Sequence, residues 1–547
     1  MITRKRMEEK HRKKWLMLVI SMCMMLSIVS PVSAYKAQLK PFKDEEYDYS
    51  REPIYMLAAL NIIDGYEDGT FQPNAPLSRE AFIKLLVAAD QLQNKVKVKK
   101  LPIDVKSQKW SAPYISYAME QNWLINLLNS KNQLQPTTTI TRQEVAALVG
   151  RAMLEQESEA TRKRWVSDDW KRARDKSSFK DQLKIKEELR PYVYYAVHRG
   201  VMEGSSGGFQ PQASLIRKQA SAVVYRYLDQ LIVGKKIELT GYYAISSYSA
   251  KQHIDKLSTV IFGWSQLEYD KEGSAKLSTT KSTFRIPDGF DEVVQLADKQ
   301  KASKELMVFY DGSNLPQFLK DKPAQTAFID SLLTVLNNKK YGFTGVHIDF
   351  EGLKAASSAP DYVQFLESLR KKLTGLTLSV AVPPTFFYKG YDLQKIGKIV
   401  DTVNLMAHDF TEKSSKQPSA PLPLVHAALV DALAVVPKEK LVLAISKQAN
   451  QWVTKSKDGI EEVSLYSPTI ADVEKRLTMA AVTGTWSMPY FLWKATFTDE
   501  SGQHEMYYED AQSIAKKIWL ARLYDIKGVS LWHMGNFTAQ DWRMISW

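Results

Sequence analysis

From about residue 238 onward, the sequence alternates between short apolar, β-branched runs and longer amphipathic segments. Segments such as TAFIDSLLTVLNNKK and DYVQFLESLRKKL have the apolar spacing of helices. Eight runs have the length and composition of strands, and they are residues 242–246, 258–264, 305–311, 345–351, 376–382, 401–407, 440–446 and 527–533. This alternation predicts an α/β fold, a (β/α)8 barrel. An open doubly wound sheet is the alternative, although no glycine-rich phosphate loop opens any of the expected helices.

The longest gap between expected strands separates the seventh from the eighth. It contains VSLYSPTIADVEKRL and MPYFLWKATFTD, which have strand and helix patterns of their own. We therefore expect a small inserted lobe beside the mouth of the barrel.

Three similar segments precede residue 235. In each, an apolar-Gln-Pro triplet stands shortly before an arginine, and the pairs are Phe71 and Arg79, Leu134 and Arg142, and Phe209 and Arg217. After each arginine, apolar residues recur at the spacing of one helix face. Each copy therefore reads as helix, loop, helix. Units of this size bury little surface alone and must pack on one another.

The N-terminal residues 1–34 have the pattern of a secretory signal peptide. A basic head precedes the apolar run WLMLVISMCMMLSIVS, and Val32-Ser33-Ala34 offers a cleavage site. A retained membrane anchor is the alternative, but the run is shorter than the roughly 20 residues that a span needs. The only cysteine, Cys23, lies in this segment, so the mature chain is expected to have no disulfide, thiolate or cysteine–metal chemistry. Removal of the seven basic and two acidic residues of 1–34 lowers the net charge from +13 to +8, and this moderately basic charge suits an anionic cell wall, although solubility alone would also explain it.

The fourth expected strand, GVHIDFE, carries acids inside an apolar run. Side chains alternate along a strand, so His347, Asp349 and Glu351 share one face. The apolar face packs on the helix layer, so the polar face points into the barrel. Glu351 ends the strand, and active sites of such barrels lie at that end. Two neighbouring carboxylates raise the pKa of one of them, and a protonated acid can donate to a leaving group. A buried ion-paired role remains the alternative.

The three N-terminal copies resemble S-layer homology (SLH) domains. The Thr-Arg-Ala-Glu signature of that family reads here Ser-Arg-Glu-Ala, Thr-Arg-Gln-Glu and Ile-Arg-Lys-Gln. The resemblance implies attachment to pyruvylated secondary cell-wall polysaccharide, with Arg79, Arg142 and Arg217 as ligands of its anionic groups. The alternative is that these arginines are solvated residues at helix starts.

The C-terminal segment resembles glycoside hydrolase family 18, in the branch of bacterial spore-cortex and cell-wall glycosidases. The family motif Asp-x-x-Asp-x-Asp-x-Glu reads here Thr344-x-x-His347-x-Asp349-x-Glu351. NLMAHDF resembles Met-x-Tyr-Asp, with a histidine in the tyrosine place, and GVSLWHMGN places a tryptophan where the family has one. The third strand departs from the family, with VFYDG in place of Ser-x-Gly-Gly.

The resemblance implies a role for each matched residue. Glu351 would protonate the leaving oxygen and later activate water. Asp349 would orient the 2-acetamido group of the substrate, whose own carbonyl oxygen attacks the anomeric carbon. His347 would link Asp349 to the barrel floor. The remaining expected substrate contacts are Asp409, His408, Met406, Trp532 and Tyr243. No metal or other cofactor is expected.

The expected domains are a signal peptide (1–34), SLH repeats (35–95, 96–160 and 161–234, the third with a charged insertion) and the barrel with its insert (235–547). Together they suggest a secreted, wall-anchored glycosidase in the cell wall or S-layer of a bacterium. It would hydrolyse β-linked N-acetylglucosamine glycan, with peptidoglycan favoured, by a retaining mechanism. A chitinase and a non-catalytic, lectin-like wall protein are the alternatives. No nucleic-acid partner is expected, nor a membrane partner after signal cleavage.

Overall fold

The structure is a computed structural model that describes residues 37–545 except 93–95, 271, 282, 458–459 and 480–481. The expected signal peptide, residues 1–34, lies outside the described residues. Within the described part of the chain, no helix combines the length and apolar character needed to span a bilayer.

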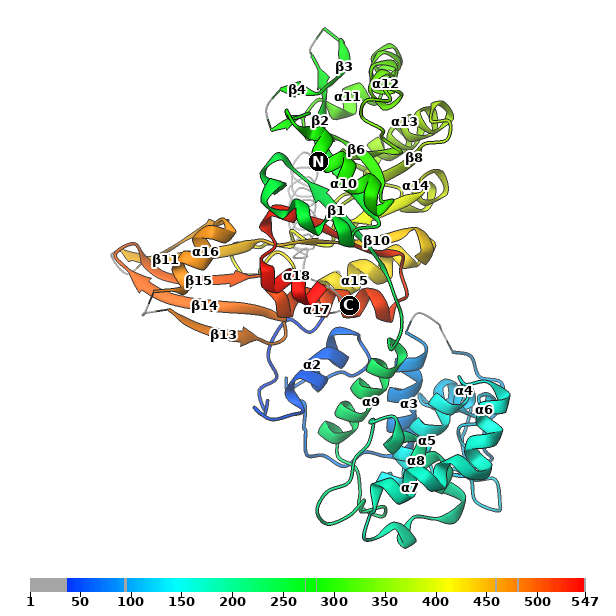
Figure 1. Ribbon diagram of the computed structural model, residues 1–547. Coiled ribbons are helices and arrows are strands. Elements are labelled where there is room, and N and C mark those ends of the chain that lie inside the picture. Colours follow the sequence, from blue (N-terminus) through cyan, green and yellow to red (C-terminus); the bar gives the residue numbers. More distant parts are fainter. Residues whose placement is uncertain are drawn as a thin grey trace, which may run out of the picture. The chain divides into compact units, whose positions relative to one another are not determined.

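The C-terminal half contains a closed barrel of eight parallel strands (Figure 1). The ring is closed by β1, which pairs with β2 on one side and with β16 on the other. In ring order the strands are β1 (Glu238–Tyr243), β2 (Thr259–Tyr269), β6 (Ser303–Tyr310), β7 (Gly345–Phe350), β8 (Thr377–Val382), β9 (Thr402–Leu405), β10 (Leu441–Ser446) and β16 (Gly528–Trp532). The predicted (β/α)8 barrel is confirmed.

One strand is displaced from its predicted position. The first strand was expected at residues 242–246, but β1 occupies Glu238–Tyr243, and Ile245–Lys256 form a 3-10 helix. The backbone of β1 pairs with both neighbours, from Glu238 opposite Gly528 to Tyr243 opposite Phe262. Pairing on both edges outweighs the low strand propensity of Gly241.

Helices cover the outside of the barrel. They include α10 (Phe290–Gln300), α12 (Lys322–Leu336), α13 (Ala359–Lys372), α14 (Leu393–Ile399), α15 (Leu422–Leu433), α17 (Ala511–Leu523) and α18 (Ala539–Ile545). The outward side chains of β7 are fully buried, and Phe350 stacks on Phe365 of α13 with 5.4 Å between ring centroids. The polar row of β7 is thereby directed into the barrel.

Two β-structures extend the barrel. A hairpin region follows β2, with β3 (Ala275–Ser278) antiparallel to β2 and a short pair of strands, β4 (Thr280–Lys281) and β5 (Phe284–Arg285). Between β10 and α17 lies a five-stranded antiparallel sheet in the order β12-β11-β15-β14-β13, drawn in orange in Figure 1. Its elements are β11 (Ala449–Lys457), β12 (Ile460–Tyr466), α16 (Ile470–Leu477), β13 (Thr483–Ser487), β14 (Leu492–Asp499) and β15 (Gly502–Tyr508). Val473 of α16 packs on the core of this sheet.

The N-terminal copies form helix pairs. These helices are α2 (Arg51–Ala59) and α3 (Arg79–Asp90), α4 (Ala112–Glu120) and α5 (Arg142–Leu154), and α8 (Arg190–His198) and α9 (Arg217–Leu231). The charged segment between the second and third copies is helical, with α6 (Glu159–Arg164), a π-helical turn (Trp165–Asp169) and α7 (Trp170–Ser177).

Hydrogen bonds connect the three copies in a ring. The first backbone N–H of each second helix donates to a loop carbonyl of the next copy. The bonds run from Arg79 to Thr138 at 2.9 Å, from Arg142 to Ala213 at 2.9 Å and from Arg217 back to Ala75 at 3.0 Å. N–H groups that a helix start leaves unpaired are thereby satisfied. The three copies of one chain therefore complete each other.

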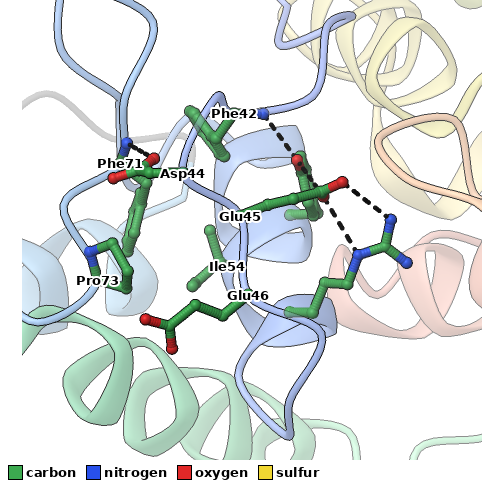
Figure 2. Close-up of a pocket in the computed structure, with 9 residues that line it drawn as sticks. Phe42, Asp44, Glu45, Glu46, Ile54, Phe71 and Pro73 are labelled. Carbon is green, nitrogen blue, oxygen red and sulfur yellow. Dashed lines mark hydrogen bonds and ion pairs between the residues drawn. The ribbon is translucent and has the colours of Figure 1, made fainter.

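One aspartate per copy holds the loop between the helices, and the sequence analysis did not single it out. The Asp44 carboxylate accepts hydrogen bonds from the backbone N–H groups of Phe71 and Gln72 at 2.6 and 2.7 Å, the first of which is drawn in Figure 2. Asp104 and Asp181 make the same pair of bonds in the second and third copies. Each pair includes the glutamine of the apolar-Gln-Pro triplet, whose φ is positive in all three copies. The carboxylate fixes this unusual backbone turn.

Candidate active site

The two acids of β7 lie at the carboxyl end of the barrel. Asp349 is only 4% exposed, and its Oδ1 has no hydrogen-bond partner within the described residues. Glu351 follows directly after the strand and is partly exposed, and its backbone N–H donates to the carbonyl of Tyr310 at 2.8 Å. Gly352 then takes a φ of +87°, which lets the chain leave the strand without steric cost. A buried acid therefore sits behind an accessible one.

The environment favours the protonated form of both acids. Burial raises the pKa of Asp349 well above its usual range, and the charge of Glu351 raises it further. Burial also raises the pKa of Glu351, helped by the charges of Asp311 and Asp409. Carboxyl groups that share a desolvated site hold on to protons, so this pair can supply a general acid near neutral pH.

His347 is a neutral anchor deeper in the barrel. Its Nε2 lies 3.0 Å from the hydroxyl of Tyr242, and its Nδ1 lies 2.7 Å from the Oγ of Ser379. Ser379 in turn donates to the buried carboxylate of Glu305. Burial lowers the pKa of His347 to about 3. His347 thus bonds to Tyr242 and Ser379. The expected hydrogen bond from His347 to Asp349 is not among these contacts.

The residues matched to Met-x-Tyr-Asp lie just after β9. Asp409 is exposed and has a φ of +66°, and the backbone N–H of His408 donates to the carbonyl of Met406 at 2.7 Å. Burial lowers the pKa of His408 to about 4, so its imidazole is neutral. The site also includes Tyr388, which the sequence analysis missed. Burial raises its pKa, and the charges of Asp409 and Glu351 raise it further.

Trp532 ends β16 and packs edge-on against Tyr242, with 5.1 Å between ring centroids. Tyr243, the predicted contact, has its ring beside Phe262 and Trp264, at 6.0 and 6.1 Å. The alternation along β1 therefore directs Tyr242 toward Trp532 and His347. Tyr243 also lines the cavity that Tyr242 and Trp532 share, so its role as a substrate contact stays a prediction.

Asp311 is a further acid that the sequence analysis did not select. It follows β6 directly, in the VFYDG segment that departs from the family pattern, and it is exposed. Its position after a barrel strand was the available signal, because carboxyl ends of parallel strands meet at one rim. Among the described residues, no group of three His, Cys, Asp or Glu side chains is arranged to hold a metal ion.

The three arginines of the N-terminal copies have unequal surroundings. Each guanidinium donates to the backbone carbonyl of the apolar residue in the next copy, namely Leu134, Phe209 or Phe71. Arg79 is also ion-paired with Glu144 at 2.6 Å. The second bonds of Arg142 and Arg217 go to neutral carbonyls, those of Glu203 and Asp64. Arg142 also lines a cavity of about 470 Å³ that Arg226 and Tyr49 share.

Models of two known families match the chain. The model of the glycosyl hydrolases family 18 matches residues 238–536, which is more than half of the chain and includes the whole barrel. The chain belongs to glycosyl hydrolases family 18. The S-layer homology domain model matches residues 41–83 and 178–221. Both predicted families are confirmed, and the SLH domains indicate association with a cell surface. The two matched SLH segments lie in the first and third copies, so the assignment of the second copy, residues 96–160, stays a prediction.

The chain is similar to cortical fragment-lytic enzymes of Bacillus anthracis and Bacillus subtilis, at 28% identity to each. Each match covers 42% of this chain and 54% of the relative, so the chain spans about half the length of these curated relatives. Among solved structures, it is similar to the spore cortex-lytic enzyme SleL of Bacillus cereus. That match has 23% identity, covers 56% of this chain and 73% of the other, and has a TM-score of 0.47. A chitinase of Chromobacterium violaceum matches at 18% identity over 57% of this chain and 98% of the other, with a TM-score of 0.49.

Proposed function

We propose that this family 18 member is a wall-anchored glycosidase that hydrolyses β-linked N-acetylglucosamine glycan of peptidoglycan. The observation that carries the proposal is the acid pair of β7. Asp349 is buried and its Oδ1 finds no hydrogen-bond partner in the part of the chain that the structure describes, while Glu351 lies at the accessible end of the strand, and the pKa of both is raised. An unpartnered buried acid costs stability, and such a cost is typical of functional sites.

In the proposed reaction, Glu351 donates its proton to the glycosidic oxygen as the bond to the anomeric carbon breaks. The carbonyl oxygen of the substrate's own 2-acetamido group attacks that carbon, and Asp349 orients the group by a hydrogen bond. Glu351 then removes a proton from water, which opens the cyclic intermediate with overall retention. Trp532 offers a flat indole to the apolar face of the sugar. His408, Met406 and Asp409 line the acetamide side.

We further propose that the SLH copies hold the enzyme on a pyruvylated secondary wall polymer. Arg142 is the favoured ligand for an anionic group, because its guanidinium donates to the neutral backbone carbonyls of Phe209 and Glu203 and it shares a cavity with Arg226. Arg79 is a weaker candidate because Glu144 already neutralises it. Arg217 resembles Arg142 in its bonding.

The catalytic proposal is tested by incubating the full chain with purified peptidoglycan and with chitin oligomers, and measuring new reducing ends. We expect release from peptidoglycan that falls on the order of 10²–10⁴-fold in Glu351→Gln, which removes the general acid. Release from chitin alone would indicate a chitinase instead. Binding without release, unchanged in Glu351→Gln, would indicate a lectin and contradict the proposal.

The anchoring proposal is tested by sedimentation of the full chain with wall fragments. Arg142→Ala is expected to weaken retention about tenfold, the loss of one charge-assisted contact. Arg164→Ala is the matched control, because this arginine is exposed in the charged helical segment and pairs with Asp169. Full retention on walls stripped of the secondary polymer would contradict the proposal.

A further inference from the structure

A row of buried polar side chains crosses the barrel interior on the inner side of the acid pair. Its members are Tyr242, His347, Ser379 and Glu305. The imidazole of His347 lies between two hydroxyl groups, with Nε2 at 3.0 Å from that of Tyr242 and Nδ1 at 2.7 Å from that of Ser379. Ser379 donates in turn to Oε2 of Glu305. We call these four residues the floor relay, because each buried polar group is the hydrogen-bond partner of the next.

Gly345 leaves the space through which Glu305 reaches the relay. In the sheet, Glu305 of β6 pairs with Gly345 of β7, and Gly345 pairs with Thr377 of β8. A Cβ at Gly345 would lie only 1.9 Å from Oγ1 of Thr377, and that same Oγ1 donates to Oε1 of Glu305 at 2.8 Å. The carboxylate therefore crosses in front of β7, because the intervening strand has no side chain at this position.

The bonds at Glu305 set the direction of the protons along the relay. Its Oε1 accepts from Thr377 and its Oε2 accepts from Ser379, so this acid is the acceptor end. A hydroxyl has a single proton, and the oxygen of Ser379 must therefore accept from an Nδ1–H of His347. Burial lowers the pKa of His347 to about 3, so the ring is neutral and carries only this one N–H. Its Nε2 is then the acceptor for the hydroxyl of Tyr242.

This direction affects the buried acid of the active site. Burial raises the pKa of Tyr242 well above its usual range, and the charge of Asp349 raises it further, so the phenol keeps its proton. That proton is given to His347 and not to Asp349, whose Oδ1 has no hydrogen-bond partner among the residues that the structure describes. The relay thus leaves Asp349 with an unused acceptor. It also fixes the ring of Tyr242, which packs against Trp532.

We propose that Glu305 is a positioning residue for the reaction, which acts through Ser379 and His347. It directs the hydroxyl of Tyr242 to the barrel floor, and Asp349 is thereby left to accept its hydrogen bond from the acetamide N–H of the substrate. This inference rests on the proposed function, in which Asp349 orients that group. A hydroxyl already bound to Asp349 would compete with the substrate for the same oxygen. Glu305 and Ser379 belong to none of the motifs from which the site was predicted.

The first test reads the tautomer of His347 in the full chain at neutral pH, by proton–nitrogen NMR with isotope-labelled histidine. The signal is assigned by its loss in His347→Asn, and the buried His426, which bonds to Tyr524 at 2.6 Å, serves as the internal reference. We expect the Nδ1–H form in the unaltered chain. An Nε2–H form there would show that Glu305 is the donor to Ser379, and it would overturn the inference.

Glu305→Met removes the acceptor end of the relay. The hydroxyl of Ser379 can then donate to Nδ1, so we expect the Nε2–H form of His347 with the signal of His426 unchanged. Ser379→Ala breaks the same link with a smaller change in volume and should give the same form, which covers the case that Glu305→Met does not fold. The Nδ1–H form in the variants as well would show that Glu305 does not set the tautomer.

The second test measures kcat and KM on a soluble N-acetylated glycan. We expect Glu305→Met to lower kcat/KM about tenfold, the effect of one misdirected hydrogen bond. Adding Tyr242→Phe to Glu305→Met removes the competing hydroxyl and should recover most of this loss, which a merely structural defect would not do. Glu292→Met, at an exposed acid of α10 that pairs with Lys251, is the control and should match the unaltered chain.

An unchanged kcat/KM in Glu305→Met, or a loss that Tyr242→Phe does not relieve, would overturn the positioning role. The two proposals fail separately, because the tautomer is read without substrate. An Nδ1–H form of His347 in an unaltered chain that releases no reducing ends would leave the direction of the relay standing and refute the proposed function.

Discussion

Two acids of one strand have different environments, and this difference assigns their roles. Asp349 is sealed behind the site, whereas Glu351 stands at its edge between Asp311 and Asp409. The first acid can orient a bound group, and the second can exchange a proton with substrate and water. The flanking acids therefore tune the general acid rather than replace it.

Asp311→Asn removes a negative charge that raises the pKa of Glu351. Glu351 must be protonated to donate, so activity is lost as pH rises through its pKa. The variant should therefore lose kcat/KM at a lower pH than the unaltered chain, as measured on a soluble glycan across pH 4–9. Asp288→Asn, an exposed acid before α10, is the control and should leave the profile unchanged. A superimposable profile for Asp311→Asn would show that this charge does not reach Glu351.

Asp349→Asn should change how stability depends on pH. The pKa of Asp349 is higher in the folded chain than the unfolded value of about 3.9. Its protonated form thus supports folding below the unfolded pKa, and this support is lost as pH rises through the folded pKa. The Tm of the Asn variant relative to that of the unaltered chain should therefore rise between pH 4 and 8. Each kcal/mol of difference in the free energy of unfolding corresponds to roughly 2–4 °C in Tm. Parallel curves for the two chains would contradict the assignment.

At the scale of elements, two local patterns carried most of what could be predicted. The eight strands follow from short apolar, β-branched runs between amphipathic segments, and the inward direction of the β7 row follows from the period of two along a strand. Tyr242 was missed because two paired neighbours extend β1 back through Gly241, which the local sequence does not show. Asp311 follows β6 and Tyr388 follows β8, so the two lie on different loops. Only closure of the barrel brings them to one rim, so no local pattern marks them.

In the N-terminal copies, too, some features are visible in the sequence and others depend on the folded structure. The triplet and the helix-start arginine are visible in the sequence, but the carboxylate that holds each loop lies about 30 residues before it. Its role depends on a backbone turn with positive φ at the glutamine, a conformation that glutamine rarely adopts. A signal was nevertheless available, because Phe-Lys-Asp stands at 42–44 and again at 179–181, whereas the second copy has Pro-Ile-Asp at 102–104.

Asp181→Ala should loosen the third copy, because the N–H groups of Phe209 and Gln210 lose their acceptor. We expect a local destabilisation of about 1–3 kcal/mol. Hydrogen–deuterium exchange of peptides covering residues 205–231 should rise, while peptides from the barrel stay unchanged. Asp175→Ala removes an exposed acid of α7 that pairs with its neighbour Arg174, and it serves as the control. Equal exchange in both variants would show that the carboxylate does not hold the loop.

At the scale of the whole molecule, the chain joins two SLH domains, and a middle copy hydrogen-bonded to both, to a family 18 barrel. An enzyme tethered to the wall meets that insoluble substrate at a high effective concentration. Tethering gives no such advantage for free oligosaccharides. Arg142→Ala should therefore slow hydrolysis of intact walls about tenfold while leaving turnover of soluble glycan unchanged. Dye release from labelled walls and reducing-end assays on soluble fragments measure the two rates. An equal loss on both substrates would place Arg142 in the folding of the chain rather than in anchoring.

The central claim is that the acid row acts through the acetamide of the substrate. It is tested most directly by following the anomeric form of the first product by proton NMR, with a soluble N-acetylated glycan and the same glycan after de-N-acetylation. We expect the N-acetylated glycan to give the β-anomer first and the de-N-acetylated glycan to remain uncleaved. Initial release of the α-anomer, or cleavage of the de-N-acetylated glycan at a similar rate, would contradict it.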